Sequence, residues 1–332
     1  MQWVRGLSLQ SAYWAWCVVD LLAGLSVAGL LAAWWRDRGG DWPWLAWMGV
    51  LSLTAVANNH GMGQVNLPVL AFVLGGLWAT ERDRPVQGGA LVGLACMLKM
   101  SPAFFVLWWM LRGRWRAVVA ACVTGALLSV AALAVVPFAV QLRFYTEVLP
   151  AFSSGDYNGL RVPISLWANH SVPDVLNAVW PGAQGELSAT ARRLSSGFTI
   201  LLLSGLAAAF WRRGPDRVAV AGQVGAVGIA TLLVPVYTYE HHLVYALPAM
   251  VAVFGAVSLR RLPRLSLLLW IPAWVVLAMN LGLLRGWTAA WTGTAALLAE
   301  EAKFIALLVF FAGSIWVGRT TQRRGTSATG VP

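Results

Sequence analysis

Residues 58–116 read NNHGMGQVNLPVLAFVLGGLWATERDRPVQGGALVGLACMLKMSPAFFVLWWMLRGRWR, with Lys99 in the middle of an apolar run long enough to cross a bilayer. An ammonium group at the centre of a membrane costs about 3 kcal/mol even on insertion-based scales. Lys99 is therefore expected to face a protein interior or a water-filled cavity. The alternative is a lysine that extends to the membrane surface and has no task.

The composition is that of a polytopic membrane protein. Of the 332 residues, 59% are hydrophobic and 11% are charged, with a mean hydropathy of +0.68. A soluble domain carries about 25% charged residues. The formal net charge is +11, and the Lys and Arg residues of the chain lie in short loops between apolar runs. This pattern sets membrane orientation, so it does not predict nucleic-acid binding.

Ten apolar segments are candidates for membrane helices, which need about 20 apolar residues each. They are roughly residues 13–35, 42–57, 65–79, 88–111, 115–138, 195–211, 218–236, 243–259, 265–284 and 295–317. The predicted fold is all-α, with one membrane domain over residues 1–318 and an external connection at about 140–194. The polar tail 319–332 is predicted to be disordered and cytoplasmic.

The distribution of Lys and Arg predicts that residues 88–111 enter the membrane and return on the same side. Five loops are basic, at residues 36–41, 80–85, 112–116, 212–217 and 260–264. If residues 88–111 crossed as one helix, the last three loops would lie opposite the first two, against the positive-inside rule. Pro102 favours a break near Lys99, because proline lacks a backbone donor and disfavours helix before it. Two re-entrant half-helices, with Lys99 at their tip, place all five loops on the cytoplasmic side.

This topology brings the polar segments of the chain together on the outer side. They are residues 58–64, the Lys99 tip, residues 140–194, 237–242 and 285–293, and they hold the four histidines, His60, His170, His241 and His242. The same topology makes the N-terminus external. Polar groups that converge on one face of a membrane protein predict a binding site there.

Several short motifs, in this order, resemble a known family. They are GQVN at residues 63–66, GLA at 93–95, LKMSP at 98–102, RGRWR at 112–116, NHS at 169–171 and VPVYTYEHHLVYALP at 234–248. Together they are similar to the polyprenol-phosphate-mannose-dependent mannosyltransferases of glycosyltransferase family 87, whose fold is GT-C. The family has Asn-Gln-Ser where this chain has Asn169-His170-Ser171.

The resemblance also implies parts that precede Met1. The family begins with an earlier helix, an external loop with the acidic residue thought to be the catalytic base, and a Tyr-Pro-Pro stretch. The expectation is therefore that residues 1–332 are catalytically incomplete as written, either because the start lies further upstream or because the chain is a fragment. The competing expectation is that Glu240 supplies the base.

The chemistry that the resemblance implies assigns roles to individual residues. Transfer of a sugar from a lipid phosphate needs a base for the acceptor proton and positive groups for the departing phosphate. Lys99 is the candidate for phosphate binding. The candidate catalytic residues are Glu240, His241 and His242, and the other candidate substrate-binding residues are Gln64, Asn66, Asn169 and His60. Glu240 either acts as the base or orients a histidine.

Simpler readings stay open for these residues. Gln64 and Asn66 fit caps of the helix that begins near Val65. His60 fits a solvated loop residue, and the NHS motif fits an N-glycosylation site that nothing else in the sequence supports. Adjacent histidines point in different directions on a helix, so Glu240, His241 and His242 lack the spacing of a zinc helix. Neither a metal nor a cofactor is predicted.

The sequence thus predicts a hexosyltransferase of the bacterial plasma membrane, with mannose as the leading sugar. The expected partners are a polyprenyl-phosphate sugar donor, a glycolipid or other envelope acceptor on the external face, and membrane lipids. A lipid-linked-sugar transporter is the first alternative, since it needs the phosphate site and no base. The second is a non-catalytic remnant that binds the lipid or a partner.

Overall fold

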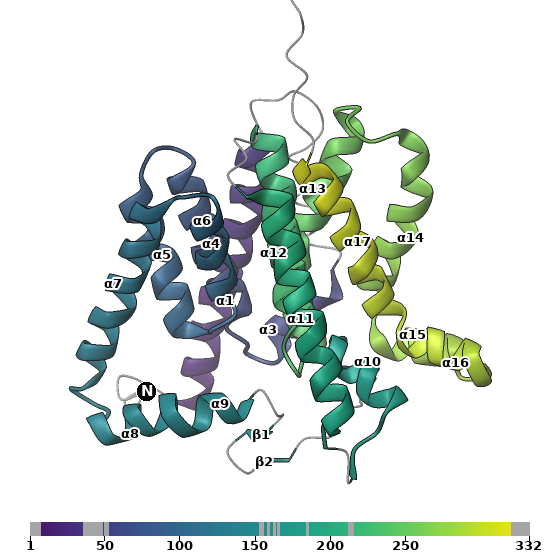
Figure 1. The fold of residues 1–332 in the computed structure, drawn as a ribbon, viewed down its shortest axis with the longest axis horizontal. Helices are drawn as coiled ribbons and strands as arrows, with labels where there is room; N and C mark the ends of the chain where they lie inside the picture. The colour runs from purple at the N-terminus through teal and green to yellow at the C-terminus, as the bar shows by residue number, and fades with distance from the viewer. Residues whose placement is uncertain are drawn as a thin grey trace, which may run out of the picture.

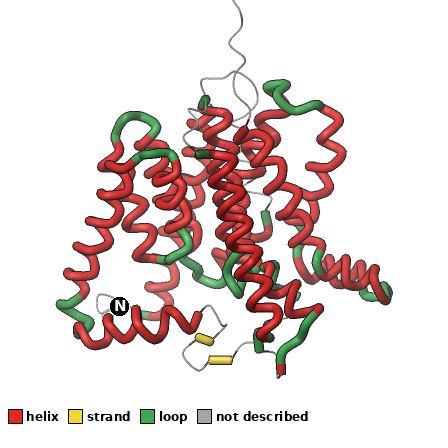
Figure 2. The backbone as a smooth tube through the Cα atoms, viewed as in Figure 1, coloured by secondary structure: helices red, strands yellow, loops and turns green. Residues whose placement is uncertain are grey.

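The computed structural model describes residues 8–35, 49, 53–152, 156–157, 160–161, 164, 167–183, 186–211 and 216–319. These residues form a bundle of helices (Figures 1 and 2). The helices of the first half are α1 Leu9–Trp35, α3 Thr54–Gly61, α4 Asn66–Thr80, α5 Pro85–Leu98, α6 Ala103–Leu111 and α7 Trp115–Ala132. Most of the predicted segment 42–57 and the tail beyond Arg319 lie outside the described residues.

The second half surrounds a central helix. Its elements are α11 Ala189–Phe210, α12 Arg217–Leu233, the 3-10 helix η6 Glu240–Ala246, α13 Leu247–Ser258, the 3-10 turn η7 Arg264–Ser266, α14 Leu267–Ala278, α15 Leu281–Thr288, α16 Gly293–Glu300 and α17 Ala302–Arg319. Every residue of α12 from Val218 to Leu233 is buried. This helix packs against α13 and α17, so the core lies along α12.

Among the described helices, five are long and apolar enough to cross a membrane, or up to seven if each of two bent pairs is one span. The first bent pair is α3 with α4, at 120°, and the second joins α14 to α15, at 108°. The all-helical fold with several candidate membrane spans is therefore found, while the predicted count of about ten membrane segments, which included the re-entrant pair, is not confirmed.

Residues 88–111 instead form two antiparallel half-helices, α5 and α6, joined by residues 99–102. Arg112, just after α6, donates from Nη1 to Oε1 of Glu81, just after α4, over 2.6 Å. An ion pair between these two turns requires α6 to return to the side on which α5 began. The backbone changes direction at Lys99, which is extended at φ −156° and ψ 139°, and α6 starts directly after Pro102.

Small residues allow α5 to pack tightly between its neighbours. A Cβ on Gly93 would lie 2.6 Å from the backbone oxygen of Ala121 in α7. One turn earlier, a Cβ on Gly89 would lie at least as close to the backbone oxygen of Ala117. Because both contacts move four residues in the same direction, α5 and α7 run parallel. In sequence, α6 lies between α5 and α7. For α5 and α7 to be parallel neighbours, α6 must run in the opposite direction. The close contacts of these glycines and the Arg112–Glu81 ion pair therefore both indicate that α6 runs antiparallel to α5.

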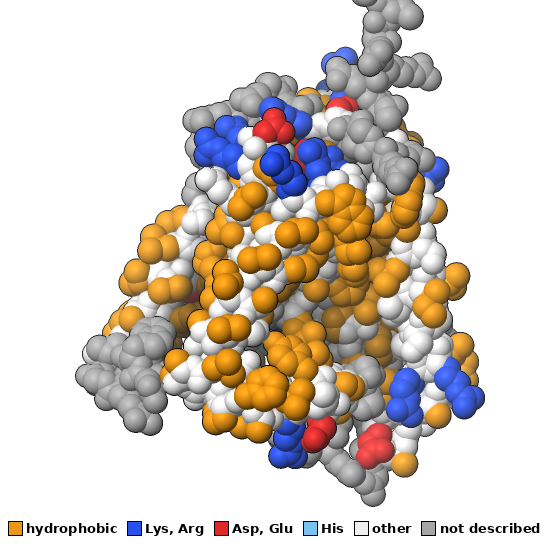
Figure 3. Space-filling model, turned by 60° about the vertical axis from the view of Figure 1, so that its left-hand side comes forward, with side chains coloured by type: hydrophobic (Ala, Val, Ile, Leu, Met, Phe, Trp, Pro, Cys, Tyr) orange, Lys and Arg blue, Asp and Glu red, His pale blue; other side chains and the backbone are white. Residues whose placement is uncertain are grey.

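The described basic loops gather at one end of the bundle, as predicted. The indole Nε1 of Trp34, at the end of α1, donates to the backbone oxygen of Arg217 at the start of α12 over 3.4 Å. Arg261 lies 2.6 Å from Asp216 at the same end. In Figure 3, Lys and Arg side chains crowd the upper end, above a wide belt of apolar side chains.

The connection between α7 and α11 lies at the other end of the bundle (Figure 1). It contains α8 Phe138–Arg143, a π-helical turn η3 Phe144–Val148, α9 Leu149–Ala151, and α10 Val172–Val179. A two-residue antiparallel ladder pairs β1 Asp156–Tyr157 with β2 Leu160–Arg161, and it departs slightly from an all-α fold. The short helices α15 and α16 lie at this end as well.

Candidate functional site

Three chain breaks meet inside the bundle and form the candidate site. They are the tip between α5 and α6, the bend between α3 and α4, and the start of η6. At their junction the ammonium of Lys99 donates to Oδ1 of Asn66 over 2.5 Å and lies 5.9 Å from the ring centre of Tyr245. Lys99 thus faces the protein interior, as predicted for a charge at membrane depth.

A chain of side-chain amides leads away from Lys99. Asn66 donates from Nδ2 to Oδ1 of Asn59 over 3.0 Å, and to the backbone oxygen of His241 over 3.2 Å. Asn59 in turn donates from Nδ2 to Oδ1 of Asp20 over 2.8 Å. A carboxylate only accepts and an ammonium only donates, so the two charged ends determine which way each amide points.

The carboxylate of Asp20 has a second partner. Its Oδ2 lies 3.1 Å from Nδ1 of His60, whose side chain is 43% exposed, while Asp20 itself is buried. Because the carboxylate accepts, the neutral imidazole carries its proton on Nδ1. The other ring nitrogen, Nε2, is then left as a proton acceptor.

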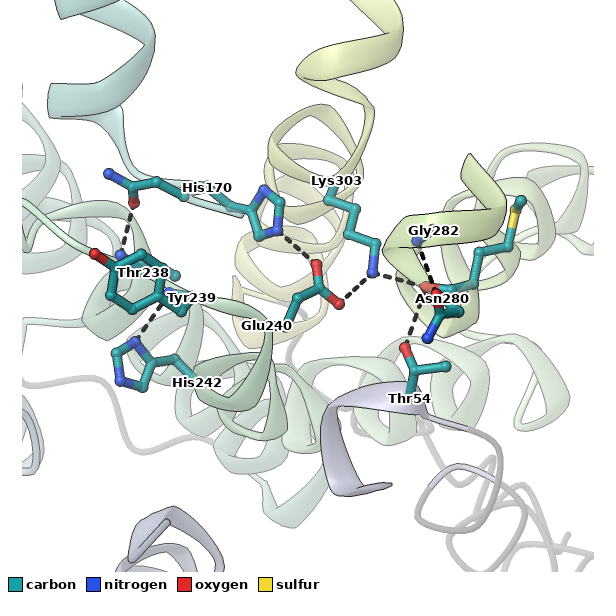
Figure 4. Close-up of polar contacts among 11 residues, drawn as sticks. Thr54, His170, Thr238, Tyr239, Glu240, His242, Asn280, Gly282 and Lys303 are labelled. Carbon is teal, nitrogen blue, oxygen red and sulfur yellow. Dashed lines mark hydrogen bonds and ion pairs between the residues drawn. The ribbon is translucent and has the colours of Figure 1, made fainter. Parts of the chain in front are cut away.

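The two consecutive histidines of η6 stand beside Lys99. Their ring centres are 4.3 Å apart with an interplanar angle of 71°, and the charge of Lys99 acts on both. The backbone N–H of Tyr239 donates to Nδ1 of His242 over 3.1 Å (Figure 4). The neutral His242 ring therefore carries its proton on Nε2 and can donate a hydrogen bond from there.

Glu240 points away from the His242 ring, into a buried ionic cluster (Figure 4). Its Oε1 lies 2.7 Å from Nε2 of His170, and its Oε2 lies 2.6 Å from Nζ of Lys303. Lys303 also donates to the backbone oxygen of Met279 over 2.8 Å, at the bend between α14 and α15. Glu240 thus contacts a histidine, but that histidine is His170 and not its neighbours in sequence.

His170 is completely buried, and burial lowers its pKa even though the Glu240 carboxylate acts in the opposite direction. The side-chain amide of the neighbouring Asn169 forms hydrogen bonds with backbone atoms. Its Nδ2 donates to the backbone oxygens of Ile164 and Val236, and its Oδ1 accepts from the backbone N–H of Thr238. Asn169 therefore holds the segment that leads into η6, and the structure does not bring it to Lys99.

The remaining predicted residues are at the α3–α4 bend. The half-buried Gln64 accepts with its backbone oxygen from Nδ2 of Asn59 over 3.0 Å. Asn66 is the first residue of α4, and Val65 caps the helix without a side-chain hydrogen bond. The amide of Asn66 therefore links Lys99 to Asn59 and does not cap its own helix.

Three polar residues of the site were not predicted from the sequence: Asp20, Asn59 and Lys303. Asp20 and Lys303 each lie within an apolar helix, and both are buried. The rule that singled out Lys99, that an ionisable group at membrane depth needs a partner, applies equally to them. No sequence signal pairs Lys303 with Glu240, because 63 residues separate them.

No group of three or more His, Cys, Asp or Glu side chains within the described part of the chain is arranged to hold a metal ion. The polar atoms of the site are instead an ammonium, imidazoles and amides. These groups bind phosphate oxygens and sugar hydroxyls, and an imidazole also moves protons. The arrangement is therefore suited to a phosphorylated sugar substrate.

Comparisons with known proteins agree with this chemistry. The model of glycosyltransferase family 87 matches residues 3–235, and so ends just before Glu240. A mannosyltransferase of Mycolicibacterium smegmatis, polyprenol-phosphate-mannose-dependent alpha-(1-2)-phosphatidylinositol mannoside mannosyltransferase, is 26% identical over 206 residues. That alignment covers 61% of this chain and 44% of the relative, so the chain spans less than half the length of the relative that it matches. No solved structure matches. Because the family model covers most of its length, the chain belongs to glycosyltransferase family 87.

Proposed function

We propose that this chain transfers a hexose, with mannose as the first sugar to test, from a polyprenyl-phosphate donor. The acceptor is a glycolipid or another envelope molecule on the external face of the bacterial plasma membrane. One observation carries the proposal: Lys99, at the tip of the re-entrant pair, meets Asn66 and the two imidazoles of η6 inside the bundle, away from the basic loops. The family match and the name of the relative support the reaction class.

Lys99 and His242 stabilise the leaving group. As the bond between the sugar and the phosphate breaks, negative charge grows on the phosphate oxygens, and fixed positive or donating groups lower the energy of that state. Lys99 supplies a point charge that Asn66 orients. His242 supplies an N–H at Nε2, because the backbone of Tyr239 occupies its Nδ1. Hydroxyls of the sugar bind to Gln64 and to the neighbouring amides.

Glu240 and Asn169 position the catalytic segment. Both carboxylate oxygens of Glu240 are held, one by His170 and one by Lys303, so a role in orienting η6 fits better than a role as a base. Asn169 binds the backbone just before η6. His241 contributes its backbone oxygen to Asn66 and its ring to the wall of the phosphate site.

The test is sugar transfer by the full chain in lipid nanodiscs, from mannosyl-phosphoryl polyprenol to a phosphatidylinositol mannoside. We expect Lys99→Met to abolish donor binding and transfer, Lys99→Arg to retain part of both, and His242→Ala to lower kcat. Arg84→Met, which removes an exposed cation at the opposite end, is the matched control. Wild-type transfer by Lys99→Met contradicts the phosphate role.

The two rival functions give different results in the same preparation. A transporter moves the lipid-linked sugar across vesicle membranes without cleaving it. A non-catalytic remnant binds the donor in a Lys99-dependent way and releases it unchanged. Net transfer of the sugar to the acceptor excludes both.

A further inference from the structure

We propose that Asp20 and His60 form a carboxylate–imidazole pair whose free nitrogen, Nε2 of His60, takes the proton from the acceptor hydroxyl during sugar transfer. The inference rests on the proposed function and names a base within residues 1–332, as an alternative to Glu240 and to the acidic residue that the family resemblance implies. In this arrangement His60 is the catalytic residue and Asp20 is a positioning residue.

The first support is the tautomer that Asp20 imposes. Oδ2 of Asp20 lies 3.1 Å from Nδ1 of His60, and Oδ1 accepts from Asn59, so both oxygens of this buried carboxylate are used. A buried carboxylate that receives an imidazole N–H fixes the ring orientation and stabilises the imidazolium that forms when Nε2 takes a proton. The side chain of His60 is 43% exposed, so an acceptor can reach Nε2.

The second support is a comparison with the other carboxylate–imidazole pair among the described residues. His170 and Glu240 lie closer than Asp20 and His60, at 2.7 Å against 3.1 Å, but His170 is 0% exposed and Glu240 also binds Lys303. No acceptor can reach that imidazole without unfolding the segment around it. Of the two pairs that the structure describes, the Asp20–His60 pair is the one that combines an orienting carboxylate with an accessible ring.

The third support is the connection to the phosphate site. Asp20, Asn59, Asn66 and Lys99 form an unbroken series of hydrogen bonds at 2.8, 3.0 and 2.5 Å. The same carboxylate therefore orients His60 and, through two amides, the ammonium that faces the phosphate. His60 and His242 also present opposite properties, since one offers a free nitrogen at Nε2 and the other offers an N–H.

These groups allow a single displacement with all protons accounted for. The acceptor oxygen forms a bond to the anomeric carbon while its proton moves to Nε2 of His60. The bond from the anomeric carbon to the phosphate oxygen breaks, and its electron pair leaves with the polyprenyl phosphate, which Lys99 and His242 stabilise. His60 then loses its proton to water, which restores the free imidazole.

The experiment uses the full chain and the same nanodisc assay, with donor binding measured alongside transfer. His60→Asn keeps an amide N–H for Asp20 but has no basic nitrogen, so it separates the base from the fold. General base catalysis contributes about 10²- to 10⁴-fold, and we expect kcat to fall in that range with donor binding retained. Because the site of His60 is accessible, added imidazole should restore part of the activity of His60→Ala. Met62→Leu, at an exposed residue of the same turn, is the control.

The role of Asp20 is tested by combining variants. Asp20→Asn lowers kcat by itself, but in a His60→Ala background it should cost little more and should remove the rescue by imidazole. A residue that only supports the fold would lower activity additively. If His60→Asn and His60→Ala turn over within about threefold of the wild type, the assignment falls while the proposed function stands. If His60→Ala is inactive, binds donor and is not rescued by imidazole, His60 is not the base. If the wild type transfers no sugar, the proposed function fails first.

Discussion

Nζ of Lys303 lies 2.6 Å from Oε2 of Glu240 and joins α17 to η6, the segment that carries both histidines of the proposed phosphate site. Both side chains are buried, at 0% and 7% exposure. A buried ion pair adds little net stability over an apolar pair, but removal of one partner leaves an uncompensated charge. The pair therefore has its greatest effect on the position of η6.

Removal of one member of this pair should destabilise the protein far more than removal of both. We expect Glu240→Gln to cost about 3–5 kcal/mol, because the ammonium of Lys303 stays buried without its counterion. The double variant Glu240→Gln with Lys303→Met should recover most of that loss. Thermal unfolding in detergent measures both, and additive losses in the double variant would show that the two residues do not act as a pair.

The re-entrant geometry predicts which loops share a side of the membrane. Single cysteines at Arg84 and Arg116, in a background without Cys17, Cys96 and Cys122, should react with an impermeant thiol reagent from the same side. A cysteine at Tyr145, in η3 at the other end of the bundle, should react from the opposite side. If Arg84 and Arg116 are labelled from opposite sides, α5 and α6 cross the membrane and the position of Lys99 must be revised.

Asn66→Asp should weaken binding of the sugar donor while the protein still folds. The new carboxylate would pair with Lys99, so the ammonium would no longer be free to bind phosphate, and the KM for the donor should rise at least tenfold. The substitution also removes the donor that Asn66 gives to Asn59 and to the backbone of His241. Asn66→Ala, which leaves Lys99 unpaired, is the comparison. An unchanged donor KM in both variants would contradict the role of Asn66 in orienting Lys99.

Glu301, between α16 and α17, should make stability depend on pH. Burial, and secondly the neighbouring Glu300, raise its pKa from 4.5 to about 7, and its Oε2 has no hydrogen-bond partner among the described residues. The folded state therefore holds this proton more strongly than the unfolded state does. The resulting contribution is full below about pH 4.5 and is lost as the pH rises through about 7.

The variant Glu301→Gln should flatten that part of the stability profile, and Glu300→Gln should shift it only slightly. Unfolding temperatures measured between pH 4.5 and 8 in one detergent provide the data. A profile for Glu301→Gln with the same slope as the wild type would assign the pH dependence to other groups.

Local sequence was sufficient for the membrane class, the re-entrant pair and the interior position of Lys99. Each depends on properties that neighbouring residues express directly: apolar length, the side on which Lys and Arg lie, and the break that Pro102 imposes. The family resemblance was likewise carried by short motifs in a fixed order, and the family match confirms it.

The partners inside the site were decided by the tertiary structure. Whether Glu240 faces His241, His170 or Lys303 depends on how η6, the segment before α10, and α17 pack. Glu240 is 70 residues from His170 and 63 residues from Lys303 in sequence. The same holds for Asp20 and His60, 40 residues apart in sequence and 3.1 Å apart in the fold. A sequence shows which groups are too polar for the membrane interior, but only packing determines which of them meet, because burial forces each to find a partner wherever the fold places one.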